Sequence, residues 1–113
     1  MVIVQVEDLA AEAARLEPAG IRKVFEIDNP QAKTVHMHPR DVPGVIPSMD
    51  QMVPPEAWYW AGSDWETRAA RHVSAITGVQ IQCVDPEGTA EKWSRAYNRE
   101  IIVCEGVPTL RYE

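Results

Sequence analysis

An internal repeat is the feature of this sequence that most constrains the fold. Displaced by 77 positions, residues 2–8 (VIVQVED) fall on residues 79–85 (VQIQCVD), and Leu16 falls on Trp93. In each copy a strand-like apolar run ends at an aspartate able to cap a following helix. A strand followed by an Asp-capped helix is common, so chance similarity is the alternative. The matched core positions favour duplication of a strand–helix unit.

The first copy continues into the signals of three more strands. Residues 2–6 are apolar and mostly β-branched, as in a buried strand, and Asp8 precedes an amphipathic helix over 9–16. The further strands are expected over residues 24–27, 34–38 and 45–49. The last of them contains Pro47, which predicts a position at the edge of the sheet. Residues 1–53 therefore predict a complete strand–helix–strand–strand–strand module.

The second copy is shorter. A strand is expected over 79–84, and Asp85-Pro86 is a strong helix start signal. Two further strands follow, over 101–104 and 109–112. Residues 73–113 therefore predict an incomplete second module, and the chain is expected to be part of a longer protein or to associate as a homo-oligomer. Residues 54–72 hold three of the four tryptophans and predict a connector that packs against the protein.

Composition excludes some classes of function. The net charge of −6 argues against nucleic-acid binding, which needs a basic surface to displace counterions. No apolar run approaches the roughly 18 residues of a membrane span, and the N-terminus has no signal-peptide pattern. Cys83 and Cys104 do not form a disulfide framework, and free thiols are typical of the reducing cytoplasm. We therefore expect a cytoplasmic protein without nucleic-acid or membrane partners.

Three segments carry a resemblance to a known family. The Asp-capped strand–helix unit with its following strands, the run from His36 to Asp50, and the tryptophan-rich segment 54–65 resemble bacterial glyoxalase-like proteins. The pattern is similar to the βαβββ module of the vicinal oxygen chelate superfamily, which includes glyoxalases, extradiol dioxygenases and bleomycin-resistance proteins. The resemblance implies an α+β fold of βαβββ modules, with a mixed sheet whose concave face lines a ligand pocket.

The period of two in a strand assigns side chains to that face. The uniformly apolar positions of residues 2–6 should face the helix, which leaves Gln5 on the concave side. The same alternation in residues 79–83 and 34–38 places Gln80, Gln82, His36 and His38 on that side as well. The residues expected to converge are Gln5, Gln80, Gln82, His36 and His38. Alternatively, the two histidines belong to the solvent face of a half-buried sheet.

The resemblance implies a small, oxygen-rich ligand, in a lyase, isomerase or dioxygenase reaction if the protein is an enzyme. His36 or His38 would be the base, and Arg40 would anchor an anionic group, unless it only pairs with Asp41. A divalent metal stays open as a cofactor. The family's usual ligand positions correspond to Met1 and Gly78, which are poor ligands, so no metal residue is assigned. The alternatives are a metal-free, drug-sequestering module and a fragment that acts in assembly.

Overall fold

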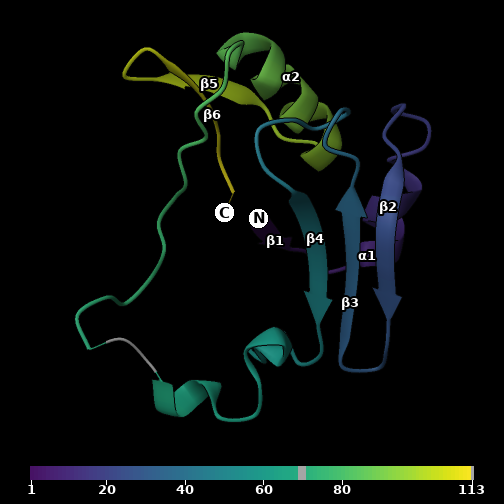
Figure 1. The fold of residues 1–113 in the computed structure, drawn as a ribbon, viewed down its shortest axis with the longest axis vertical. Coiled ribbons are helices and arrows are strands. Elements are labelled where there is room, and N and C mark those ends of the chain that lie inside the picture. The colour runs from purple at the N-terminus through teal and green to yellow at the C-terminus, as the bar shows by residue number, and fades with distance from the viewer. Residues whose placement is uncertain (69–70, 113) are drawn as a thin grey trace.

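Two sheets of unequal size organise the chain, as Figure 1 shows. The computed structural model describes residues 1–68 and 71–112. It has an α+β fold with a four-stranded mixed sheet and a separate two-stranded sheet, which confirms the expected α+β class and the mixed sheet. In chain order the elements are β1 (Val2–Gln5), α1 (Leu9–Ala14), β2 (Lys23–Asp28), β3 (Ala32–Met37), β4 (Pro47–Met52), the short 3₁₀ helices η1 (Tyr59–Ala61) and η2 (Trp65–Arg68), α2 (Pro86–Tyr97), β5 (Ile101–Cys104) and β6 (Val107–Leu110).

The large sheet has the order β1-β4-β3-β2. β4 pairs parallel with β1 and antiparallel with β3. The expectation that β4 lies at an edge is therefore wrong. Pro47 is the first residue of the strand, a position at which a missing backbone N–H interrupts the pairing least.

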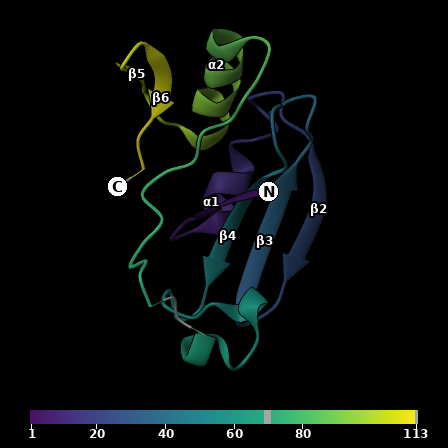
Figure 2. The ribbon, with the colours of Figure 1, turned by 60° about the vertical axis from the view of Figure 1, so that its left-hand side comes forward.

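One face of this sheet packs against α1 and forms the main core. Leu16, just beyond the end of α1, is fully buried together with Met37 of β3 and Met49 of β4. Val2 and Val4 of β1 pack against the same cluster, as the parity of the strand predicts. Figure 2 shows α1 on this side of the sheet. The helix-facing assignment of the first module is therefore confirmed.

The two copies of the repeat begin their helices in the same way. The Asp8 carboxylate accepts a hydrogen bond from Ala11 N–H, and the Asp85 carboxylate accepts one from Gly88 N–H, both at 3.0 Å. Their backbones agree closely, with φ and ψ of −133° and 93° at Asp8 and −126° and 89° at Asp85. Both aspartates are N-caps that satisfy a free N–H of the first helical turn. The predicted N-caps are therefore confirmed in both copies.

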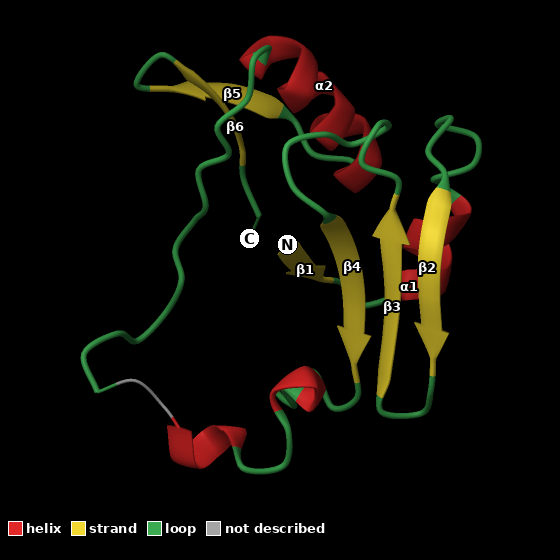
Figure 3. Cartoon of the chain, viewed as in Figure 1, coloured by secondary structure: helices red, strands yellow, loops and turns green. Residues whose placement is uncertain are grey.

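The strand expected over 79–84 does not form. Residues 74–83 have no regular secondary structure, and Figure 3 draws this stretch as loop. Among the described residues, no backbone hydrogen bond outside the helices and strands involves residues 71–84. Ile81 nevertheless packs at the core, where its Cγ2 lies so close to Gly44 that a Cβ there would be 2.6 Å away. A strand needs a hydrogen-bonded neighbour on at least one side. This segment has the sequence of a strand but has no such neighbour among the described residues.

Truncation of Leu16 tests the packing of the main core. Leu16 has no exposed surface, so Leu16→Ala should lower the free energy of unfolding by about 2–5 kcal/mol, through lost burial and the cavity left behind. Urea denaturation followed by tryptophan fluorescence measures this change. Ile46→Ala is the control, because Ile46 is 51% exposed and its truncation should cost less than about 1 kcal/mol. Equal losses in the two variants would contradict this account of the core.

Candidate functional site

A row of polar side chains crosses the sheet on the face opposite α1. Gln5 of β1 is in register with Asp50 of β4, which is in register with Thr34 of β3. In the next row, His36 of β3 is in register with Ser48 of β4. Directly opposed residues in paired strands share a face, so these five side chains lie on one side of the sheet. The predicted position of Gln5 and His36 on a common face therefore holds in the register.

Asp50 is the centre of this row and is only 2% exposed. One carboxylate oxygen, Oδ1, accepts a hydrogen bond of 2.8 Å from the Thr34 hydroxyl and a short one from the Ser48 hydroxyl. The other oxygen, Oδ2, accepts a bond of 2.6 Å from Trp60 Nε1. A buried carboxylate is costly unless such donors replace water, and here both oxygens are supplied. The group of Thr34, Ser48, Asp50 and Trp60 is called the Asp50 cluster below.

The connector covers the Asp50 cluster. Trp60 in η1 supplies the indole N–H, and the Gln5 side chain donates from Nε2 to the Pro55 carbonyl at 2.8 Å. The prediction that the tryptophan-rich segment packs against the protein is supported by these contacts. Because the donors and acceptors of the cluster satisfy one another, its chemistry is that of a structural support beneath the connector.

The two candidate histidines have different surroundings. His36 is half-buried and lies against Phe25, with ring centroids 4.8 Å apart. His38 follows the end of β3, where its Nδ1 accepts a hydrogen bond of 3.1 Å from the Arg40 N–H. With Nδ1 acting as the acceptor, a neutral His38 carries its proton on Nε2. His36 is thus held by an aromatic contact, whereas the ring orientation of His38 is fixed by the turn that bears Arg40.

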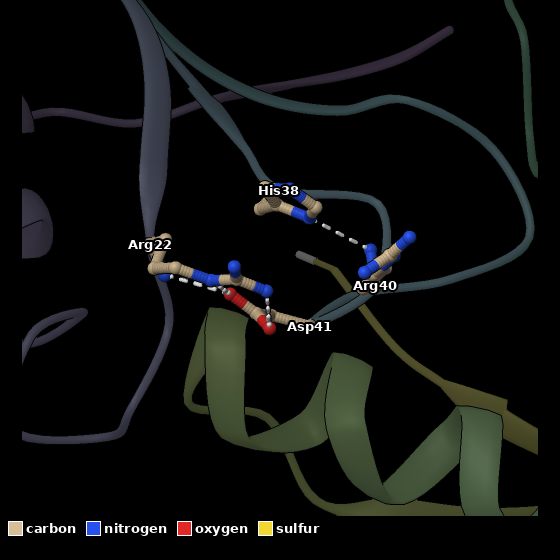
Figure 4. A network of polar contacts seen from close by, with 4 residues as sticks. All are labelled: Arg22, His38, Arg40 and Asp41. Carbon is tan, nitrogen blue, oxygen red and sulfur yellow. Dashed lines mark hydrogen bonds and ion pairs between the residues drawn. The ribbon is translucent and has the colours of Figure 1, made fainter.

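Asp41 pairs with Arg22 and not with Arg40, as Figure 4 shows. Arg22 Nη2 lies 2.7 Å from Asp41 Oδ1, while Arg22 Nε and the Arg22 backbone N–H lie 2.8 and 2.9 Å from Oδ2. This bidentate geometry suits a guanidinium and a carboxylate. Hydrogen bonds from the Arg22 side chain and backbone hold the pKa of Asp41 well below its ordinary value. The hydrogen bonds that the Arg22 side chain donates to Asp41 likewise raise the pKa of Arg22.

Arg40 lines a hollow of about 170 Å³ beside Lys92 and Arg95 of α2. Asp41 also lines it, but both of its oxygens are engaged by Arg22. In the part of the chain that the structure describes, none of the three cationic side chains forms an ion pair. Three basic groups from two separate elements thus border one small space, which is called the cationic hollow below.

Gln80 and Gln82 lie elsewhere. Both are exposed and line a different space, a cleft of about 700 Å³ between residues 79–83, α2 and β6. Neither His36 nor Gln5 lines this cleft or the cationic hollow. The structure therefore brings Gln5 and His36 to one sheet face, places His38 beside Arg40, and sets the other two glutamines apart.

The donor groups do not fit a metal centre. No group of three or more His, Cys, Asp or Glu side chains within residues 1–68 and 71–112 is arranged to hold an ion. Asp50 is a carboxylate on the predicted ligand face, and its oxygens are already taken by hydroxyl and indole donors.

The sequence patterns did not single out several residues of the Asp50 cluster and the cationic hollow. Asp50 and Ser48 alternate along β4, so period two places them on one face once the strand is extended to Met52. Lys92 and Arg95 are three positions apart on α2, a spacing that puts them on one side of the helix. Their approach to Arg40 had no local signal, because it depends on how α2 docks against the turn after β3.

No family model, curated protein or solved structure matches this chain. In the described residues, no helix combines the length and the apolar character required to span a membrane. The side chains that bear on function are those of the Asp50 cluster and the cationic hollow.

Trp60→Phe tests the Asp50 cluster. It removes one N–H donor from a buried carboxylate while keeping an aromatic ring, so the free energy of unfolding should fall by about 1–3 kcal/mol. Trp58→Phe is the matched control, because the two indoles are similarly exposed, at 39% and 36%, and no hydrogen bond from the Trp58 ring is present among the described residues. Urea denaturation of both variants gives the comparison. A loss in Trp58→Phe as large as in Trp60→Phe would contradict the role of the indole N–H.

The Arg22–Asp41 pair predicts an acid-dependent contribution to stability. Because the pKa of Asp41 is lower in the folded protein than in the unfolded chain, its contribution is present above the unfolded value of about 3.9 and is lost as the pH falls below it. Asp41→Asn should therefore be less stable than the parent protein at pH 7. The difference should shrink below about pH 4, because the unfolded parent chain then takes up a proton on Asp41 while the folded protein still keeps the charge. Urea denaturation from pH 7 to pH 2 measures this, and a difference that stays constant over the range would exclude the proposed linkage.

Proposed function

We propose that this chain is a glyoxalase-like binding protein that holds a small oxygen-rich anion, a carboxylate or phosphate, in the cationic hollow. The observation that carries the proposal is the meeting of Arg40, Lys92 and Arg95 around one space in a chain of net charge −6. Cations are costly to gather unless an anion offsets their repulsion. The proposed ligand supplies that negative charge.

The neighbouring acid does not neutralise the hollow. Asp41 directs both oxygens to Arg22, through contacts of 2.7 and 2.8 Å between side chains. The guanidinium groups of Arg40 and Arg95 remain available, and each can donate hydrogen bonds to two oxygens of a ligand. Lys92 adds a third positive charge. The space of about 170 Å³ equals the volume of roughly five or six liquid waters, which suits a phosphate or a small carboxylate.

The fold supports the family part of the proposal. Residues 2–52 run strand, helix, strand, strand, strand in a mixed sheet, and the Asp-capped strand–helix start recurs in the second half. This is the arrangement that the resemblance to the vicinal oxygen chelate superfamily leads one to expect. The ligand, however, is proposed for the hollow at Arg40, and not for the sheet face beneath the connector, where the Asp50 cluster is already satisfied.

His38 does not itself line the hollow, but its ring adjoins the turn that carries Arg40, so it is the candidate for proton transfer if the bound molecule reacts. Its ring is oriented by the Arg40 N–H, and its Nε2 is left to exchange a proton. His36 is the weaker candidate because its ring lies against Phe25. A binding protein without catalysis would use the same hollow. The two functions differ in whether the bound ligand is converted to a product or released unchanged.

Calorimetric titration with inorganic phosphate and with oxalate tests the proposal. Arg40→Gln and Arg95→Gln should each weaken binding by about tenfold or more, since each removes charge-assisted hydrogen bonds. Lys33→Gln is the control with the same change of charge, because Lys33 pairs with Asp28 at the opposite end of the sheet. The proposal fails if the parent binds neither anion, or if Lys33→Gln weakens binding as much as the arginine variants.

A further inference from the structure

Trp93 of α2 joins this helix to the turn that carries Arg40. Its indole Nε1–H donates to the Pro43 carbonyl at 2.8 Å, and Pro43 lies three residues after Arg40. Lys92 and Arg95 border the cationic hollow from the same helix. Figure 4 shows the turn beside α2. A hydrogen bond from Trp93 thus links the two elements that supply the cations of the hollow.

Two other contacts hold these elements, and neither connects the helix to the turn. The pair between Asp41 and Arg22 fixes the turn against the residue before β2. The Tyr97 hydroxyl donates to the Ser48 carbonyl at 3.1 Å, which fixes α2 against β4. The contact made by Trp93 therefore differs from both, because it acts directly on the spacing between α2 and the turn.

The core alone does not account for an indole at this position. Leu16, which falls on Trp93 in the 77-residue repeat, is fully buried and has no polar atom in its side chain. Trp93 is likewise buried, at 5% exposure, and stacks on Tyr97 with ring centroids 5.3 Å apart. An aliphatic side chain fills the matching core position of the first half, so packing does not explain the N–H donor.

Like charges oppose the approach of α2 to the turn. Lys92 and Arg95 are three positions apart on one side of the helix, and Arg40 borders the same hollow from the turn. Repulsion among the three cations favours a wider separation of the two elements. A hydrogen bond between neutral groups of the same two elements opposes that separation without adding a charge to the hollow.

We propose that Trp93 is a positioning residue of the cationic hollow. By holding the Pro43 carbonyl, it keeps Arg40 within reach of an anion bound to the cations of α2. This role rests on the proposed function, the binding of an anion in the hollow. Trp93 does not itself line the hollow. It acts on the ligand through the spacing of the two elements, which prepares the site before the anion binds.

Calorimetric titration of Trp93→Phe with phosphate and with oxalate tests this role. Phenylalanine keeps an aromatic ring but removes the donor, so affinity for the anion should fall by about fivefold or more. Trp60→Phe is the matched control. It also removes an indole N–H from a hydrogen bond, but at the Asp50 cluster, whose residues do not line the hollow. Its affinity should change by less than about twofold.

The indole N–H resonances of the parent protein supply a second readout. During the anion titration, the Nε1–H resonance of Trp93 should shift with the same midpoint as the calorimetric binding curve, because its acceptor lies in the turn that contacts the ligand. The Nε1–H resonance of Trp60 should stay constant. A purely structural role of Trp93 predicts no such selective shift. This measurement uses the parent chain, so it decides the matter even if Trp93→Phe fails to fold.

Failure of the positioning role is distinguishable from failure of anion binding. If the parent binds an anion and Trp93→Phe binds it as tightly, Trp93 does not position the hollow, while the proposed function stands. Equal weakening by Trp60→Phe, or a Trp93 resonance that does not respond to the bound anion, overturns the role in the same way. If the parent binds neither phosphate nor oxalate, the proposed function and the role of Trp93 both fail. Circular dichroism checks that both variants are folded before their affinities are compared.

Discussion

The insertion of β4 between β1 and β3 is the pairing on which the first half of the structure depends. β4 closes the sheet by satisfying backbone groups of a strand that precedes α1 and of a strand that follows it. It also carries Met49 to the core on one face and Asp50 to the polar row on the other. A single strand thus joins the main core to the Asp50 cluster, since successive residues point to opposite faces.

In the described residues, the second half has a capped helix and a hairpin but no strand at the place of β4. Its helix begins at an equivalent aspartate cap, and its hairpin turns at Glu105 and Gly106, which both have positive φ as a tight hairpin requires. Yet the segment equivalent to β1 pairs with no strand among the described residues, although its sequence favours a strand. The contrast between the two halves shows that strand propensity becomes a strand only where a neighbour supplies hydrogen bonds.

The second half is nevertheless held to the first by specific contacts. Trp93 donates from Nε1 to the Pro43 carbonyl at 2.8 Å, and the Tyr97 hydroxyl donates to the Ser48 carbonyl at 3.1 Å. Burial raises the pKa of Tyr97 well above its ordinary value, so this donor stays protonated. These contacts set the position of α2, and with it the approach of Lys92 and Arg95 to Arg40 that forms the cationic hollow.

The sequence by itself determined the local features: the capping of both helices, the order of elements in residues 2–52, and the side of β1 that faces the core. These depend on residues close together in the chain, whose spacing fixes their geometry. Only the tertiary structure decided that β4 is central and that Asp41 pairs with Arg22 instead of Arg40. It also decided that residues 79–84 find no strand partner in the part of the chain that the structure describes. Each of these depends on which distant backbone or side chain arrives beside the residue, and that follows from the packing of the whole chain.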